Sequence, residues 1–244
     1  MKIIKVKDIQ ALNKKAAYLV ASQIIEKPNC VLGLATGSTP IGTYQELIKL
    51  YNDDIIDFKE VITFNLDEYI GLPNTNPQSY AWFMNRHLFD FINISDNNVH
   101  IPNGMAEDIG KECMEYEDQI KKVGGIDLQV MGIGRNGHIG FNEPDVMFEN
   151  LTHVVELDEQ TILDNSRFFN SLEDVPKRAI SMGIKTIMNA RKILLLATGE
   201  KKTEIVHEMI YGRISSNVPA TVLQLHPNVI VLVDEAAGKL IKEG

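Results

Sequence analysis

The sequence predicts a single, doubly wound α/β domain in which helices flank a mostly parallel, Rossmann-like central sheet. Short apolar runs rich in β-branched residues recur along the 244 residues, and segments with helical spacing separate them. No internal repeat or Pro/Gly-rich linker divides the chain. Alternation of strand and helix favours right-handed crossovers between parallel strands. We therefore expect residues 1–244 to form one domain.

The predicted strands are short, and several are apolar at consecutive positions, which is typical of strands that are buried on both faces of a sheet. They are Val31–Ala35, Val61–Phe64, Val99–Ile101, Ile126–Met131, Leu151–Glu156, Ile193–Thr198 and Val229–Val233. In such sheets ligands bind beyond the carboxyl ends of the strands, so functional motifs are expected just after each strand.

Helices are predicted between these strands. The first carries apolar residues that step by three and four and therefore share one face, namely Ile9, Leu12, Ala16, Leu19, Val20 and Ile24. Further helices are predicted near 40–52, 78–90, 107–122 and 201–211.

The charge balance limits the partners. Lys and Arg number 24 against 33 Asp and Glu, which gives a formal net charge of −9. This argues against nucleic acid, because duplex binding relies on Lys and Arg that neutralise phosphates. A single phosphate is not excluded, because helix-terminal amides and one or two local cations can hold it whatever the net charge.

The cysteines and the hydropathy indicate the compartment. Cys30 and Cys113 lack CxxC spacing, which fits a reduced protein better than a disulfide framework or a thiolate metal site. The first residues lack the apolar core of a signal peptide, and no apolar run approaches the roughly 20 residues of a membrane span. We therefore expect a cytoplasmic protein without a membrane segment.

The segment Leu34–Pro40, LATGSTP, follows one predicted strand and opens a predicted helix. Thr39 is a candidate N-cap, and Pro40 suits the first helical position. Gly37 permits close approach of the backbone, and Ser38 adds a hydroxyl beside the free amides, so the segment can bind an anion. An ordinary strand–turn–helix junction is the alternative. The segment matches neither GxxxxGK[ST] nor GxGxxG, which disfavours a nucleotide.

Adjacent carboxylates, Asp67 and Glu68, follow the next strand in VITFNLDEY. Acids at the end of a buried strand are costly to desolvate unless they are hydrogen-bonded or paired. Such placement is typical of a general base whose pKa is raised by burial. In the alternative interpretation, Asp67 caps the next turn and Glu68 faces water.

The segment Gly132–Pro144, GIGRNGHIGFNEP, places four glycines around His138. Such glycine density indicates tight turns and close approach of the backbone to a small ligand. Histidine is suited to proton transfer near neutral pH, and Glu143 is placed to orient it. The alternatives are a His–Glu metal pair or a histidine that faces the core. Zinc is disfavoured, because neither HExxH spacing nor another nearby histidine is present.

A phosphate site should also attract cations. Arg167 lies in a polar connection within 145–175, a segment suited to a mobile lid, and Lys201 follows the strand Ile193–Thr198 in ATGEKK. A solvated surface charge is the alternative for either residue.

Together these motifs resemble the glucosamine-6-phosphate deaminases of the glucosamine/galactosamine-6-phosphate isomerase family. The matching stretches occur in the family's order across nearly the whole chain and are LGLATGSTP (32–40), VITFNLDEYIGL (61–72), SYAWFMNRHLF (79–89), GIGRNGHIGFNEP (132–144), NSRFF (165–169), ATGEKK (197–202) and LQLHP (223–227). NLDEY together with GHIGFNEP separates the chain from the related 6-phosphogluconolactonases.

The resemblance implies a hydrolase of amino-sugar catabolism that converts glucosamine 6-phosphate and water to fructose 6-phosphate and ammonia. It implies neither a metal nor an organic cofactor. Asp67 matches the base that moves a proton from C2 to C1 through an enolamine. His138 matches the acid/base that opens the pyranose ring, supported by Glu143 and Asn136. The residues that match the phosphate site are Thr36, Gly37, Ser38, Thr39, Arg167 and Lys201.

Two features depart from parts of the family. Position 136 is Asn where many relatives carry Asp, so it can orient an imidazole but cannot stabilise imidazolium by charge. The segment 145–157 lacks the Arg/Lys pattern that the allosteric hexameric members use for an effector phosphate. We therefore expect no activation by N-acetylglucosamine 6-phosphate, and a monomer or a low-order homo-oligomer.

Two rival functions stay open. The first is another phosphosugar enzyme of the same architecture, such as a lactonase or a ketose isomerase. The second is a phosphosugar-sensing module, which the acidic charge and the lack of an N-terminal helix-turn-helix disfavour.

Overall fold

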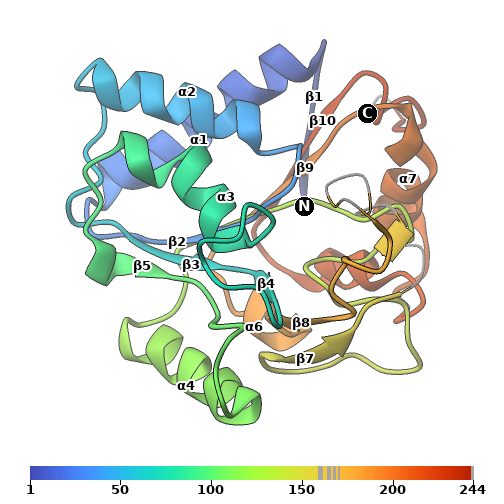
Figure 1. Cartoon of the computed structure of the whole chain (residues 1–244). Helices are drawn as coiled ribbons and strands as arrows, with labels where there is room; N and C mark the ends of the chain where they lie inside the picture. Colours follow the sequence, from blue (N-terminus) through green and yellow to red (C-terminus); the bar gives the residue numbers. More distant parts are fainter. Residues whose placement is uncertain (159–161, 164–165, 167–168, 170, 243–244) are drawn as a thin grey trace.

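The computed structural model describes residues 1–158, 162–163, 166, 169 and 171–242. Within these residues, a seven-stranded sheet has the order β1-β10-β9-β6-β2-β3-β5, and all its neighbours pair in parallel (Figure 1). The strands are β1 (Lys2–Val6), β2 (Val31–Leu34), β3 (Ile62–Asn65), β5 (Val99–His100), β6 (Leu128–Met131), β9 (Ile193–Ala197) and β10 (Val229–Asp234). The predicted α/β class with a parallel central sheet is confirmed.

The strand order reverses between β2 and β6. From β2 the chain proceeds outward through β3 to β5, then returns to β6 on the other side of β2 and proceeds through β9 to β10. The crevice beyond the carboxyl ends of two such strands is where open α/β sheets bind ligands. The topology therefore directs attention to the turns that follow β2 and β6.

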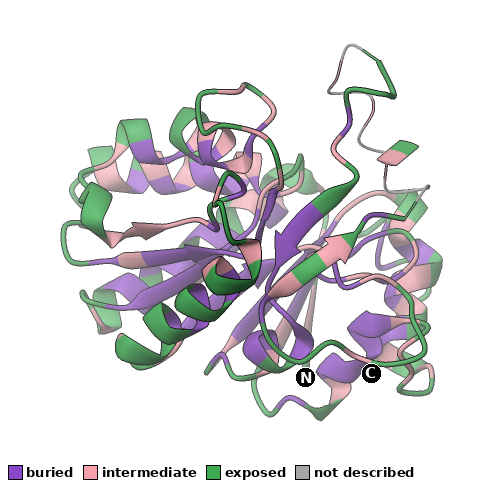
Figure 2. Ribbon diagram, turned by 60° about the horizontal axis from the view of Figure 1, so that its bottom comes forward, coloured by how far each residue is buried: buried purple, intermediate pink, exposed green. Residues whose placement is uncertain are grey.

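Helices cover both faces of the sheet, and each face has its own apolar core. One core joins the strands to α1 (Ile9–Glu26), α2 (Ile41–Asn52) and α3 (Tyr80–His87). The other joins them to α4 (Ile109–Lys122), α6 (Ile184–Met188) and α7 (Thr203–Tyr211). Figure 2 shows the result, with buried strands between helices whose outer faces are exposed. In the part of the chain that is described, no helix is long and apolar enough to cross a membrane.

The first helix illustrates how the sequence dictates these elements. The Asp8 carboxylate caps α1 by accepting a hydrogen bond from the Ala11 amide at 2.9 Å. Leu12, Ala16 and Val20 of the predicted stripe are buried against the sheet. Short 3-10 helices complete the secondary structure at Phe89–Phe91, Asp96–Asn98, Glu200–Lys202 and Pro219–Leu225.

A second, antiparallel sheet has the order β4-β8-β7, formed by β4 (Asp67–Tyr69), β8 (Arg178–Ser181) and β7 (His153–Glu156). The prediction that Leu151–Glu156 contributes to the parallel sheet is therefore wrong. In β7 half-buried and exposed positions alternate, because the small sheet shields only one of its faces. This sheet matters for function because β4 begins with Asp67.

Candidate active site

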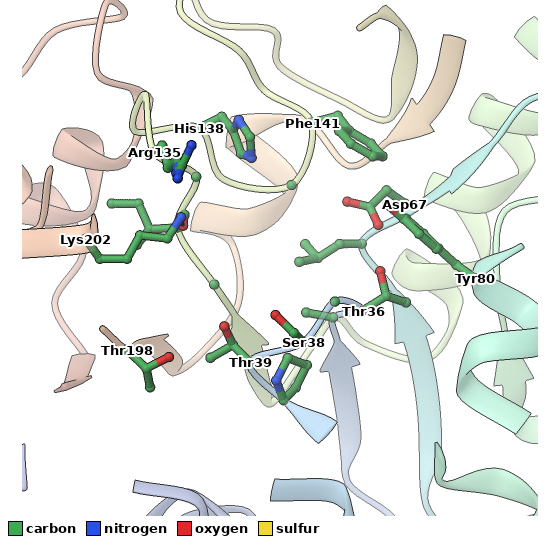
Figure 3. Close-up of a pocket in the computed structure, with 18 of the residues that line it drawn as sticks. Thr36, Ser38, Thr39, Asp67, Tyr80, Arg135, His138, Phe141, Thr198 and Lys202 are labelled. Atoms are coloured by element: carbon green, nitrogen blue, oxygen red, sulfur yellow. Dashed lines mark hydrogen bonds between the residues drawn. The ribbon is translucent and has the colours of Figure 1, made fainter. Parts of the chain in front are cut away.

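A pocket of about 400 Å³ lies at the switch point of the parallel sheet. Its walls come from the turns after β2, β6 and β9 and from the junction of β3 with β4, so four neighbouring strands contribute. Figure 3 shows Thr36, Ser38 and Thr39 along one side and Asp67, Tyr80 and Phe141 along another. His138, Arg135 and Lys202 approach from the remaining side. The topology thus brings together motifs that are far apart in the sequence.

The turn after β2 is the segment that the sequence predicts to bind an anion. Residues Thr36–Pro40 line the pocket, and Gly37 has a φ of 99°, a left-handed conformation that a side chain would disfavour. The predicted cap is wrong by one position, because Pro40 itself is the N-cap of α2 and no side chain caps this end. The Pro40 backbone already has helical angles, and no side-chain hydrogen bond caps this end of the helix. The Thr39 hydroxyl lies along the pocket beside the helix N-terminus, where an anion is favoured.

Two lysines approach this loop from the turn after β9. Lys201 and Lys202 both line the pocket, but they differ in exposure. Lys201 is exposed, whereas Lys202 is half-buried and its Nζ donates a 2.6 Å hydrogen bond to the Ile133 carbonyl. Sequence reasoning missed Lys202, because two adjacent lysines look alike until the 3-10 turn Glu200–Lys202 directs them differently. Arg167, the other predicted cation, lies outside the described residues.

The turn itself is held by an acid from the neighbouring strand. Asp234, at the end of β10, accepts hydrogen bonds from the Gly199 amide on both carboxylate oxygens, at 3.1 and 3.0 Å. It also accepts one from the Ala237 amide at 2.8 Å. The loop that carries the lysines is thereby tied to the sheet. Arg135, on the turn after β6, adds a further cation at the pocket that the sequence reasoning did not select.

Asp67 is the acid of the pocket. Its side chain is buried, with 7% of the residue exposed. Burial, and secondarily the negative charge of Glu68, raises the pKa of Asp67 to about 8. The Tyr80 and Phe141 rings, which stack with centroids 6.1 Å apart, belong to the same part of the pocket. The sequence predicted the burial and the raised pKa, but it did not find the two aromatic residues.

Glu68 points away from the pocket and is fully buried. Its carboxylate accepts hydrogen bonds from the amides of Tyr69, Tyr80 and Ala81 at 2.8–2.9 Å. The alternative in which Asp67 caps a turn and Glu68 faces water is therefore wrong, because Glu68 does the capping. The two adjacent acids therefore differ in role: Asp67 lines the pocket, whereas Glu68 binds the first amides of α3.

His138 is linked to the acid that the sequence had assigned to it. Its Nδ1 lies 3.0 Å from Glu143 Oε2, which leaves Nε2 on the opposite side of the imidazole ring. Asn136 donates a 2.7 Å hydrogen bond to the same Glu143 oxygen and accepts a 3.2 Å bond from the His138 amide. Asn136 thus orients the imidazole through Glu143 and the backbone, and not by a direct bond to the ring.

A glycine makes room for this imidazole. A Cβ at Gly134 would lie 2.4 Å from both Cε1 and Nε2 of the His138 ring, so any side chain there would displace it. The same loop then passes Asp67, since a Cβ at Gly140 would lie 3.7 Å from Asp67 Oδ2. The histidine loop and the buried acid therefore border one space.

The arrangement suits proton transfers on a small phosphorylated molecule. Amides, hydroxyls and cations lie on one side for an anion, while a buried carboxyl and a supported imidazole lie on the others for acid–base chemistry. Among the described residues, no group of three or more His, Cys, Asp or Glu side chains is placed to hold a metal ion.

Comparisons with known proteins agree with this geometry. Residues 6–231 match the model of the family described as glucosamine-6-phosphate isomerases/6-phosphogluconolactonase. The chain belongs to this family. The glucosamine-6-phosphate deaminase of Clostridioides difficile (strain 630) is 58% identical over 97% of this chain and 95% of its own length. That of Thermoanaerobacter pseudethanolicus is 57% identical over 100% of this chain and 96% of its own.

Solved structures of the family place the chain on the deaminase side. A monomeric glucosamine-6-phosphate deaminase of the NagB superfamily superposes with a TM-score of 0.96 at 46% identity, covering 98% of this chain and 100% of the other. A 6-phosphogluconolactonase from Thermotoga maritima has a TM-score of 0.76 at 20% identity, covering 96% and 99%. The second likeness concerns the fold alone.

Proposed function

We propose that this protein is a glucosamine-6-phosphate deaminase, which converts glucosamine 6-phosphate and water to fructose 6-phosphate and ammonia. The observation that carries the proposal is a single pocket with an anion loop on one side and two separate proton-transfer groups, Asp67 and His138, on the others. The high identity to deaminases over the full chain supports the same conclusion.

The substrate's phosphate is held at Thr36–Thr39, where amides precede α2. Lys202, held by its hydrogen bond to the Ile133 carbonyl, supplies a charge from another wall of the pocket, and Lys201 supplies a more exposed one; Arg167 stays a predicted partner. Holding the phosphate fixes the distance of the sugar carbons from the catalytic groups, which is a large part of catalysis for a small substrate.

His138 opens the pyranose ring. With Nδ1 bound to Glu143, the Nε2 atom takes the proton from the anomeric hydroxyl and returns a proton to the ring oxygen. Glu143 keeps the imidazole oriented, and Asn136 holds Glu143 in place. The product of this step is the open-chain amino aldehyde.

Asp67 then isomerises the open chain. As carboxylate it takes the proton from C2, which gives an enolamine, and it delivers a proton to C1. The resulting imine at C2 is hydrolysed by water to fructose 6-phosphate and ammonia. The raised pKa of Asp67 makes its carboxylate a stronger base, and the cationic amine at C2 of the bound substrate favours the ionised form.

The sequence and the similarity to known deaminases support further expectations about partners, location and oligomeric state. The net charge of −9 supports the absence of nucleic acid partners, and the two cysteines, both free and buried, support a cytoplasmic location. The likeness to a monomeric deaminase supports a monomer or low-order oligomer. We keep the prediction that N-acetylglucosamine 6-phosphate does not activate the enzyme.

A coupled assay for ammonia and fructose 6-phosphate tests the proposal. Equimolar release of both products from glucosamine 6-phosphate is expected, unchanged when N-acetylglucosamine 6-phosphate is added. Parallel assays with 6-phosphogluconolactone and with glucose 6-phosphate should give no turnover. Hydrolysis of the lactone without ammonia release would instead assign the chain to the lactonase branch.

A further inference from the structure

Glu68 is a fully buried acid that the proposed mechanism does not use. Among the described residues, its carboxylate accepts hydrogen bonds from three backbone amides, and Asp67 precedes it directly in β4. Burial of a carboxylate costs free energy unless hydrogen bonds compensate for the lost water, so we looked for what these hydrogen bonds do for the neighbouring base.

Its contacts join two elements. Oε1 accepts from the Tyr69 amide in β4 at 2.8 Å and from the Tyr80 amide at the start of α3 at 2.9 Å. Oε2 accepts from the Ala81 amide at 2.9 Å. Ser79, the N-cap residue, takes the next amide, that of Trp82, at 3.1 Å. The free amides of the first turn of α3 are therefore shared between Glu68 and Ser79.

The residue that α3 presents at this point is Tyr80. Its ring lines the pocket, stacks on Phe141 and lies 4.8 Å from the Tyr69 ring between centroids. Glu68 thus holds the strand that carries Asp67 and the helix that carries Tyr80 at a fixed spacing. Ser79 caps the same helix, but its hydroxyl accepts a hydrogen bond from the Trp82 amide and donates one to the Asn74 carbonyl, so neither bond reaches β4.

We propose that Glu68 is a positioning residue for the deaminase reaction, clamping Asp67 and Tyr80 into one rigid wall of the pocket and setting the charge beside Asp67. This inference rests on the proposed function for its kinetic part. Its electrostatic part concerns the free enzyme and can be tested without turnover.

The charge beside Asp67 is dominated by Glu68. Among the described residues, the phenols of Tyr80 on α3, Tyr44 on α2 and Tyr116 on α4 also interact electrostatically with Asp67. Burial raises the pKa of all three phenols above the ordinary value, so they stay neutral. His138 with Glu143 lies across the pocket, and the cations Arg135, Lys201 and Lys202 line its other side.

Three variants separate charge, spacing and helix capping. Glu68→Gln removes the charge and turns an amide NH₂ toward one of the backbone amides. Glu68→Asp keeps the charge but retracts the carboxylate by one methylene. Ser79→Ala is the matched control, because it removes a hydrogen bond at the same helix end and leaves the link to β4 intact.

Steady-state kinetics on glucosamine 6-phosphate should show a loss in kcat of about 10- to 100-fold for Glu68→Gln and Glu68→Asp, with a smaller change in KM. The acidic limb of the pH profile should move down by about one pH unit in Glu68→Gln only, because removal of a negative neighbour lowers the pKa of Asp67. Ser79→Ala should lower the free energy of unfolding, while the acidic limb of its pH profile and its kcat stay as in the wild type.

The titration of the Asp67 carboxyl in the free enzyme, followed by ¹³C NMR and assigned by its absence in Asp67→Asn, provides the readout that needs no substrate. A lower midpoint in Glu68→Gln and an unmoved one in Glu68→Asp support the charge effect. An unmoved midpoint together with wild-type kcat in Glu68→Gln overturns the proposal. If Glu68→Gln fails to fold, as judged by Trp82 fluorescence, wild-type kcat in Glu68→Asp overturns it.

Failure of the wild type to release ammonia would refute the proposed function, whereas the NMR result would still decide whether Glu68 sets the charge at Asp67.

Discussion

The two ends of the pocket treat negative charge in opposite ways. At the anion loop, amides, hydroxyls and lysines surround a place for a phosphate, and the lysine-bearing turn is tied to the sheet by Asp234. At the reacting end, Asp67 and Glu68 are buried as neighbours, and burial raises the pKa of both. The first end attracts an anion, while the second makes a carboxylate reactive.

This contrast explains how an acidic protein can bind an anionic substrate. The net charge of −9 is distributed over the whole chain, but binding depends on groups within a few ångströms, because salt screens exposed charges beyond about 10 Å. The negative charge of Glu68 lies beside Asp67, whose pKa it raises, and not at the proposed phosphate position. The following variants probe the two ends separately.

The largest effect is expected for Asp67→Asn. The amide cannot take the C2 proton, so kcat should fall by about 10³-fold or more, while binding of a phosphosugar inhibitor persists. Steady-state kinetics and inhibitor titration check this. Turnover near the wild-type value would remove Asp67 as the base.

The same variant also tests the electrostatics of the reacting end. Because the pKa of Asp67 is raised to about 8 in the folded state, its contribution to stability is present below pH 4 and is lost as the pH rises toward 8. Asp67→Asn should therefore unfold at a higher urea concentration than the wild type at pH 8, with a free energy of unfolding that is larger by on the order of 5 kcal/mol. The two proteins should converge near pH 4.

A smaller loss is expected for Gly134→Ala. The new Cβ would overlap the His138 ring and turn it from Glu143, which should lower kcat by about 10- to 100-fold on the cyclic substrate. Gly110→Ala is the control, since Gly110 does not line the pocket and a Cβ there would make only ordinary contact with Asp108, the N-cap of α4. Wild-type activity in Gly134→Ala would show that the imidazole position is not critical.

Effects on KM are expected at the anion end, where the two lysines provide a matched pair and Lys201→Ala should have the smallest effect of all. Lys202→Ala should raise KM by about 10- to 100-fold with a modest change in kcat, because a half-buried charged group is lost. Lys201→Ala should raise KM by only about threefold, because its side chain is exposed. Equal effects, or the reverse order, would contradict the assignment based on burial.

The parallel sheet could be predicted because its strands are buried on both faces and therefore read as apolar runs. The small sheet could not, since Asp67–Tyr69 is polar and looks like a loop, and Arg178–Ser181 is too short to stand out. Both strands are defined by pairing with distant segments and not by local sequence.

The site divides in the same way. Some site residues lie in motifs whose residue types indicate anion binding or proton transfer, namely Gly37, Asp67, His138 and Glu143. The structure brings them to one pocket or its rim. Tyr80 could not be recognised as a pocket residue, because the sequence shows it only as the first residue of a helix. Lys202 could not be distinguished from the identical residue before it. The position of the predicted lid residue Arg167 lies outside the described residues, and movement of 145–175 stays a prediction.

The pairing of β1 with β10 has a consequence for synthesis. Lys2 lies opposite Ile230 and Val6 opposite Asp234, so β1 can pair with β10 only after every strand between them in the sequence has been synthesised. Contacts of such high sequence separation slow folding. Because Asp234 also anchors the lysine-bearing turn, this edge of the sheet and the proposed phosphate site are both completed only once β10 has formed.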